Sequence, residues 1–217
     1  PKFERRVGES KIDRLVGGFR YVRQDPVVFR AIGTVFMFSM FCMPFVVLYP
    51  AMASVDWGVS TKSTLYGLLY ATFGLGAVVG ALSVGTFLSG HRIENVLRAA
   101  FVMFGASLAA YITIRGPALA FPIGFLLGFF YFVVVTSLST IFQSRLDHSI
   151  RGRVSAVWMM CFGGTVPVAG LIAGWIVSHS SVNTVIYFGA AFALFLAWFA
   201  DLRPPEERAA LRSITSD

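Results

Sequence analysis

Apolar residues dominate the chain in long runs, which are separated by short polar stretches. A helix needs about 20 mostly apolar residues to cross the hydrocarbon core of a bilayer. Six runs reach this length, and Arg98, near the start of the third, is the only charged residue inside them. The predicted spans are Ala31–Ala53, Leu65–Ser89, Val96–Ile114, Ala118–Phe142, Val154–Val177 and Val182–Ala200. The runs are too long for barrel strands, so the pattern predicts an all-α membrane protein with six transmembrane helices.

Polar segments flank this predicted six-helix domain, which covers residues 31–201. Residues 1–30 form a predicted cytoplasmic linker. Apolar side chains in the linker recur at helical spacing, at Ile12, Leu15, Phe19 and Val22. This spacing suits an amphipathic helix on the inner leaflet, and a plain linker helix fits it equally well. Residues 202–217 form a predicted cytoplasmic tail, which we expect to be disordered.

The distribution of charge predicts the orientation in the membrane. With six spans, both termini lie on the same side as the loops after the second and fourth spans. That side carries 16 Lys and Arg residues, whereas the other side carries 2, Lys62 and Arg115. We therefore expect both termini to be cytoplasmic. Charged residues make up only 13% of the chain, which excludes a soluble domain, and the net charge of +7 reflects this bias rather than nucleic-acid binding.

Small residues recur in the second and fifth spans at spacings that allow close helix contact. Gly76 and Gly80 are four residues apart in the second span. The fifth span holds Gly163 and Gly170, together with Pro167, which predicts a kink. Both small-residue stretches begin with Phe-Gly, which is a weak indication of a three-plus-three repeat typical of transporters.

Carboxylates and histidines are absent from the predicted spans. His91, His148 and His179 all lie in loops, and the two cysteines lie in apolar runs, so we expect no metal site, disulfide or cofactor. A membrane-embedded enzyme would need a nucleophile with a base, but Ser137 and Ser139 have no histidine at membrane depth. The sequence therefore does not predict an enzyme.

Two polar stretches resemble a known family. These are "GGFRYVRQDPVVFRAI", before the first span, and "RLDHSIRGRVSAVW", which contains Arg-Gly-Arg-Val at residues 151–154. They resemble the C-terminal half of a major facilitator superfamily transporter, closest to the enterobactin-exporter-like group of bacterial transmembrane secretion effectors. The resemblance runs from about Leu15 to Leu202. It departs from the family pattern in the loop after the second span, where Ser89 stands in place of an aspartate.

The resemblance implies half of a twelve-helix fold, built as a three-plus-three inverted repeat. It also implies secondary active efflux of a small molecule by alternating access. The expected partners are the substrate, the lipid bilayer and either an N-terminal six-helix half or a second copy, with no nucleic acid, in a bacterial inner membrane. The implied cytoplasmic gate loop contains Asp147, Arg151, Gly152 and Arg153.

In such a half, the first, second, fourth and fifth spans would face the cavity and the other two would face lipid. The candidate substrate-lining residues are Phe38, Phe41, Tyr70, Tyr131, Thr136 and Thr140. Lipid-facing packing is the alternative for the aromatic residues. The fourth span carries a polar stripe on one face, for which bonding to a neighbouring helix is the alternative; its residues are Thr136, Ser139, Thr140 and Gln143. Two other functions stay open, namely a self-contained six-helix homodimer and a non-transporting membrane scaffold.

Overall fold

The computed structural model describes residues 18–20, 22–146, 150–200 and 202. All regular elements within these ranges are helices, and six of the resulting segments are long and apolar enough to cross a membrane. They are Pro26–Asp56, Thr64–Gly85, Ile93–Thr113, Pro117–Ser144, Arg151–His179 and Val182–Phe199. The prediction of an all-α protein with six spans is therefore confirmed. Most of the predicted linker, the predicted tail after Leu202 and Asp147 lie outside the described residues.

The first span consists of three helical parts, which are α2 (Pro26–Met37), the π-helix η1 (Phe38–Cys42) and α3 (Pro44–Asp56). Asp25 caps α2, because its carboxylate accepts two backbone N–H bonds of 2.8 and 3.2 Å in the first turn. The backbone N–H of Met43 donates to the carbonyl of Phe38 at 3.2 Å, five residues back. Pro44 has no N–H to donate and follows this wider turn directly, so a π-bulge joins the two α-helical parts.

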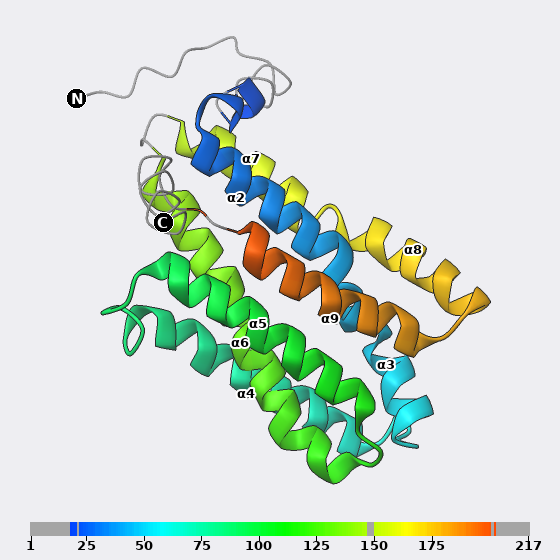
Figure 1. The fold of residues 1–217 in the computed structure, drawn as a ribbon. Coiled ribbons are helices and arrows are strands. Elements are labelled where there is room, and N and C mark those ends of the chain that lie inside the picture. The colour runs from blue at the N-terminus through cyan, green and yellow to red at the C-terminus, as the bar shows by residue number, and fades with distance from the viewer. Residues whose placement is uncertain (1–17, 21, 147–149, 201, 203–217) are drawn as a thin grey trace, which may run out of the picture.

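The helices α4 (Thr64–Gly85), α5 (Ile93–Thr113) and α6 (Pro117–Ser144) lie together on one side of the bundle (Figure 1). The closest crossing is between α4 and α6. A Cβ atom on Gly76 or Gly80 of α4 would overlap the backbone of α6, and one on Gly128 of α6 would overlap the backbone of α4. Helices in lipid approach this closely only where side chains are absent, so these glycines set the distance between α4 and α6.

The fifth span is interrupted rather than kinked. It consists of α7 (Arg151–Phe162) and α8 (Val166–His179), and it leads into α9 (Val182–Phe199). The N–H groups of Gly163 and Gly164 both donate to the carbonyl of Met159, at 2.8 and 3.3 Å, which closes α7. Pro167 lies in the first turn of α8, where it needs no N–H donor. The sequence predicted one continuous span here, but the glycine pair ends the helix before the proline is reached.

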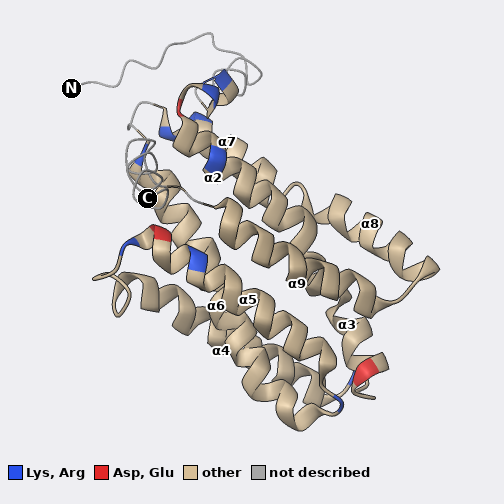
Figure 2. Ribbon diagram, in the orientation of Figure 1, with Lys and Arg blue, Asp and Glu red and all other residues tan. Residues whose placement is uncertain are grey.

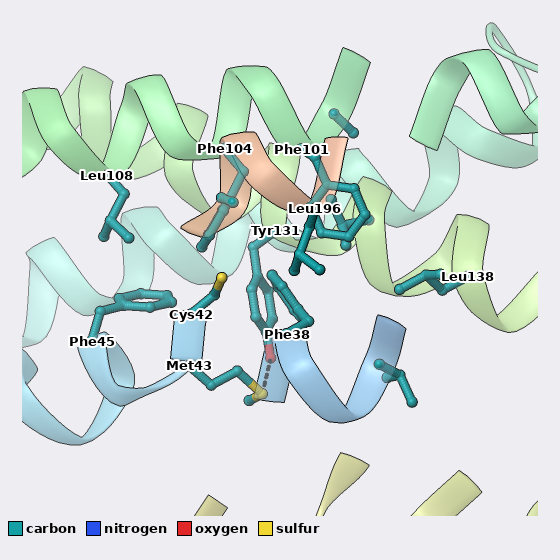
Figure 3. Packing of buried hydrophobic residues seen from close by; sticks show 14 of the residues in the cluster. Phe38, Cys42, Met43, Phe45, Phe101, Phe104, Leu108, Tyr131, Leu138 and Leu196 are labelled. Carbon is teal, nitrogen blue, oxygen red and sulfur yellow. Dashed lines mark hydrogen bonds between the residues drawn. The ribbon is translucent and has the colours of Figure 1, made fainter. Parts of the chain in front are cut away.

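Among the described residues, the charged ones lie toward the two ends of the bundle, and its middle is uncharged (Figure 2). The middle is filled by aromatic side chains from several helices (Figure 3). Phe38 is fully buried, and its ring centroid lies 5.7 Å from that of Phe101, 5.5 Å from that of Phe104 and 5.7 Å from that of Tyr131. These edge-on and tilted contacts tie the first span to α5 and α6.

Candidate functional site: adjoining pockets along α4 and α6

Two adjoining pockets follow α4 toward its C-terminal end. The aromatic pocket, of about 610 Å³, lies between α3, α4 and α6, and the inner pocket, of about 380 Å³, lies between the end of α4, the start of α5 and α6. The aromatic pocket is lined by Val46, Tyr70, Phe73, Ala77, Tyr131 and Phe132, among others. The inner pocket is lined by Val84, Ser89, His91, Val96, Thr136 and Thr140, among others. Ala81 lines both, so the two pockets meet at this position on α4.

The aromatic pocket brings together Tyr70 and Tyr131, two of the candidate lining residues. Tyr70 is 45% exposed, whereas Tyr131 is 6% exposed and lies deeper. Phe73 links them, since its ring centroid is 6.2 Å from that of Tyr70 and 5.9 Å from that of Tyr131. The Tyr131 hydroxyl donates to the thioether sulfur of Met43 at 3.8 Å (Figure 3). A thioether sulfur is a weak acceptor.

Two other candidates, Phe38 and Phe41, do not line either pocket. Phe38 lies behind Tyr131, inside the core. Phe41 packs on α9, where its ring centroid is 5.9 Å from that of Phe188 and 4.4 Å from that of Phe192. In the present arrangement Phe38 supports the aromatic pocket from behind, while Phe41 joins the first span to α9.

The inner pocket contains the polar stripe of α6. The hydroxyl of Thr140 donates to the carbonyl of Thr136 at 2.8 Å, and the amide of Gln143 donates to the hydroxyl of Ser139 at 2.8 Å. These bonds stay within α6, so the stripe does not tie α6 to a neighbouring helix through them. Thr136 and Thr140 both line the pocket, which gives it a hydroxyl-bearing wall.

The first turn of α7 carries three of the four predicted gate residues. Arg151 and Gly152 are exposed there, and Arg153 is half-buried. A Cβ atom on Gly18 would lie 2.8 Å from the backbone oxygen of Arg153, so the helical segment before the first span packs directly on α7. The fourth gate residue, Asp147, is outside the described residues.

The remaining predicted packing residues, in the fifth span, make fewer contacts than those in α4. Gly170 faces Val47 of α3, whose side chain would lie 3.5 Å from an added Cβ atom. Gly163 meets only the carbonyl of Met159 in its own segment, and Pro167 is exposed.

An ion pair that the sequence does not predict lies at the end of the bundle opposite the first turn of α7. Arg115 donates to the carboxylate of Asp56 at 2.8 Å, and this ties the end of α3 to the loop between α5 and α6. The Asp56 side chain is 3% exposed and its second oxygen has no hydrogen-bond partner. The only sequence signal is that Arg115 is one of two cations on that side. Nearby, the hydroxyls of Tyr49 and Tyr111 are 2.7 Å apart in the buried interior.

The described part of the chain contains no group of three His, Cys, Asp or Glu side chains that could hold a metal ion. Six apolar helical spans with charged residues at both ends of the bundle define an integral multi-pass membrane protein. The sequence profile of the transmembrane secretion effectors of the major facilitator superfamily matches residues 4–214. The chain belongs to this family, which consists of transporters and is not an enzyme class.

Curated relatives agree with this assignment. The chain is 28% identical over 158 residues to the enterobactin exporter EntS of Escherichia coli O1:K1, and 28% identical over 160 residues to the enterobactin exporter EntS of Citrobacter koseri. Each match covers 69% of this chain but only 35% of the relative, so the chain corresponds to a part of these longer proteins. No solved structure matches the chain.

Proposed function

We propose that the natural protein is a secondary active exporter of a small molecule, that it works by alternating access, and that residues 1–217 are its C-terminal half. Family membership supports transport across a membrane. Export is supported by the name of the curated relatives, the enterobactin exporters. The proposed substrate surface is the wall formed by Tyr70, Tyr131, Thr136 and Thr140, because these four line adjoining pockets on one side of α4 and α6.

The proposal of a half-transporter rests on the exposure of the fifth span and on its interrupted backbone. Only 11% of its most apolar stretch is buried, compared with 61% in the first span. Its backbone is interrupted halfway along, where Pro167 cannot donate to the carbonyl of Gly163. Lipid cannot satisfy free backbone groups, so irregular backbone at membrane depth occurs only where protein or water covers it. This side of the fifth span therefore requires a cover other than lipid.

The cover that we favour is an N-terminal six-helix half. The curated relatives are much longer than the matched segment, which supports further spans in the natural protein. The exposed side of α8 carries large apolar side chains, including Leu171 and Trp175, that suit a protein partner better than an aqueous channel. A second copy of the same chain is the alternative cover.

A cysteine introduced on α8 distinguishes the two covers. In a cysteine-free version of the natural protein, Leu171→Cys labelled with benzophenone maleimide should, on illumination, form cross-links within one chain and none between copies. Leu194→Cys on α9 is the matched control, because it is also exposed but lies on the helix expected to face lipid. A homodimer would instead be established if two copies were cross-linked through residue 171 and light scattering gave the mass of two chains.

The proposed location is a bacterial inner membrane with both termini in the cytoplasm, and the proposed gate is the loop that carries Arg151 and Arg153. Arg145 is exposed just before this loop, and Lys62 is exposed at the opposite end of the bundle. In intact cells, a membrane-impermeant maleimide should label Lys62→Cys, whereas Arg145→Cys should react only after the membrane is opened. The reverse pattern would invert the topology.

Export itself is tested by comparing culture supernatants of the parent strain and a deletion strain by mass spectrometry. We expect at least one small molecule to be depleted outside and enriched inside the deletion strain, and to be restored by the gene. Dissipating the transmembrane ion gradients in the parent should reproduce the loss, because secondary transport needs an ion gradient. An unchanged set of secreted molecules would favour the scaffold function.

A further inference from the structure

Aromatic rings form a continuous wall from the outer end of α4 into the aromatic pocket. The ring centroids of Tyr66 and Tyr70 are 6.4 Å apart with an angle of 29° between their planes, so the rings are stacked. Tyr70 then contacts Phe73, and Phe73 contacts Tyr131, at 6.2 and 5.9 Å between centroids. Tyr70 is the most exposed of these lining rings, so it presents π surface toward the pocket opening.

None of the described residues that line the aromatic pocket is charged. A cationic ligand would gain cation–π attraction from the tyrosines, but moving an ion out of water without a paired countercharge costs more than such contacts return. An uncharged ring system meets no such penalty and gains contact with Tyr70 and Phe73. The wall therefore favours uncharged ring-bearing groups over cations.

Tyr131 lines the aromatic pocket, and its hydroxyl lacks a strong hydrogen-bond acceptor. Tyr131 is only 6% exposed, and among the described residues its hydroxyl donates only to the thioether sulfur of Met43, at 3.8 Å. A thioether is a weak acceptor, so a ligand oxygen that accepts from this hydroxyl would improve its hydrogen bonding. Tyr131 thus offers a donor at the inner end of a wall that is otherwise aromatic and aliphatic.

We propose that the aromatic pocket binds an uncharged, ring-bearing part of the substrate, which stacks on Tyr70 and accepts a hydrogen bond from the Tyr131 hydroxyl. This inference rests on the proposed transport function, since it specifies the substrate class of the same surface. It concerns the part of the substrate that contacts this chain. A charged group elsewhere on the substrate would have to contact another part of the protein.

Benzophenone is a suitable probe, because it is an uncharged aromatic ketone that cross-links on illumination. The natural protein in membrane vesicles is illuminated with increasing probe, and labelled peptides of α4 and α6 are quantified by mass spectrometry. Tyr70→Leu removes the ring and Tyr131→Phe removes only the hydroxyl. Each should raise the half-saturating concentration about 3- to 10-fold, the range expected for one aromatic contact or one hydrogen bond.

Two further variants serve as controls. Tyr70→Phe keeps the ring and should leave the half-saturating concentration unchanged. Tyr187→Leu on α9 should also have no effect, because Tyr187 is 45% exposed like Tyr70 but lines neither pocket. If Tyr187→Leu changed the labelling as much as Tyr70→Leu, the signal would reflect general membrane partitioning and the proposal would be wrong.

A pair of competitors tests the preference for an uncharged ring system that carries an acceptor. N-methylacridone is an uncharged ketone, whereas N-methylacridinium is a cation with three fused rings that lacks the ketone oxygen. The ketone should displace benzophenone from the pocket at least about 10-fold more effectively, and equal competition would overturn the proposal. Saturable labelling in a protein whose deletion changes no secreted molecule would refute the export function and leave the binding inference intact. Export without saturable labelling would refute this inference alone.

Discussion

The crossing of α4 and α6 gives the sharpest test of the packing in this structure. Gly128 of α6 lies against the backbone of α4 at Phe73 and Ala77. The change Gly128→Ala adds one methyl group, which would overlap the carbonyl of Phe73 and lie 3.2 Å from the N–H nitrogen of Ala77. A backbone carbonyl cannot rotate away as a flexible side chain can, so the two helices have to separate or shift along their length.

The size of the effect follows from two opposing terms. Replacing glycine by alanine inside a helix stabilises it by roughly 0.5–1 kcal/mol, because the backbone of the unfolded chain loses freedom. Overpacking a close contact costs about 1–3 kcal/mol, and the cost here lies in the upper half of that range because the obstacle is backbone. The net loss expected for Gly128→Ala is about 1–2 kcal/mol. Gly74→Ala in α4 is the control, since no atom lies within 4 Å of its added Cβ atom.

Thermal unfolding can be followed with a thiol-reactive dye, because Cys42 is 1% exposed and reacts only when the bundle opens. The natural protein should carry Cys42 as its only cysteine for this purpose. One kcal/mol corresponds to about 2–4 °C in Tm for a chain of this size, so Gly128→Ala should melt about 2–8 °C below the parent. Gly74→Ala should melt at or above it. Equal Tm values for the two variants would refute the close crossing.

Three further substitutions test other contacts by the same measurement. Gly18→Val should lower the stability by about 1–3 kcal/mol, because its side chain would meet the backbone of α7 in the structure, whereas Gly33→Val has open space and should not. Arg115→Ala should lower the stability by about 1 kcal/mol, because it leaves the buried Asp56 carboxylate unpaired. Adding Asp56→Asn should restore most of this loss, and a double variant that is less stable than Arg115→Ala would contradict the explanation. Tyr111→Phe should cost about 1 kcal/mol, because the buried hydroxyl that faces it on α3 loses its partner, and an unchanged Tm would show that this bond contributes nothing.

The sequence predicted the number and order of the spans because lipid imposes a simple rule. Charge must leave the hydrocarbon core, and backbone groups must pair within each segment, so uninterrupted apolar runs of sufficient length can only be helices. The ends of the helices in the structure differ from the predicted ends of the spans. The first span begins at Pro26 rather than Ala31, because Asp25 caps the helix and Arg30 is tolerated one turn inside it. An arginine near a span end can extend its charged group toward the interface.

The sequence could not predict which residues of the first span share a face. In a regular α-helix Phe38, Phe41 and Phe45 would lie along one side, which is why two of them were candidates for one surface. The π-bulge inserts an extra residue between Phe38 and Met43, and this rotates the following part of the helix. Phe45 consequently joins Phe73 and Tyr131, whereas Phe41 turns toward α9. No local pattern marks such a bulge before the neighbouring helices are known.

Hydrophobic patterns also fail to separate a lipid-facing side chain from one at a binding surface. Tyr70 and Tyr187 are equally exposed and both lie within apolar helices, so neither composition nor exposure tells them apart. The difference lies in their neighbours. The Tyr187 hydroxyl is 3.2 Å from that of Thr113 on α5, while Tyr70 joins a run of rings that ends at an under-bonded hydroxyl inside a pocket. Because lipid and protein interior are both apolar, sequence determines how deep a residue lies, and only tertiary contacts determine what it faces.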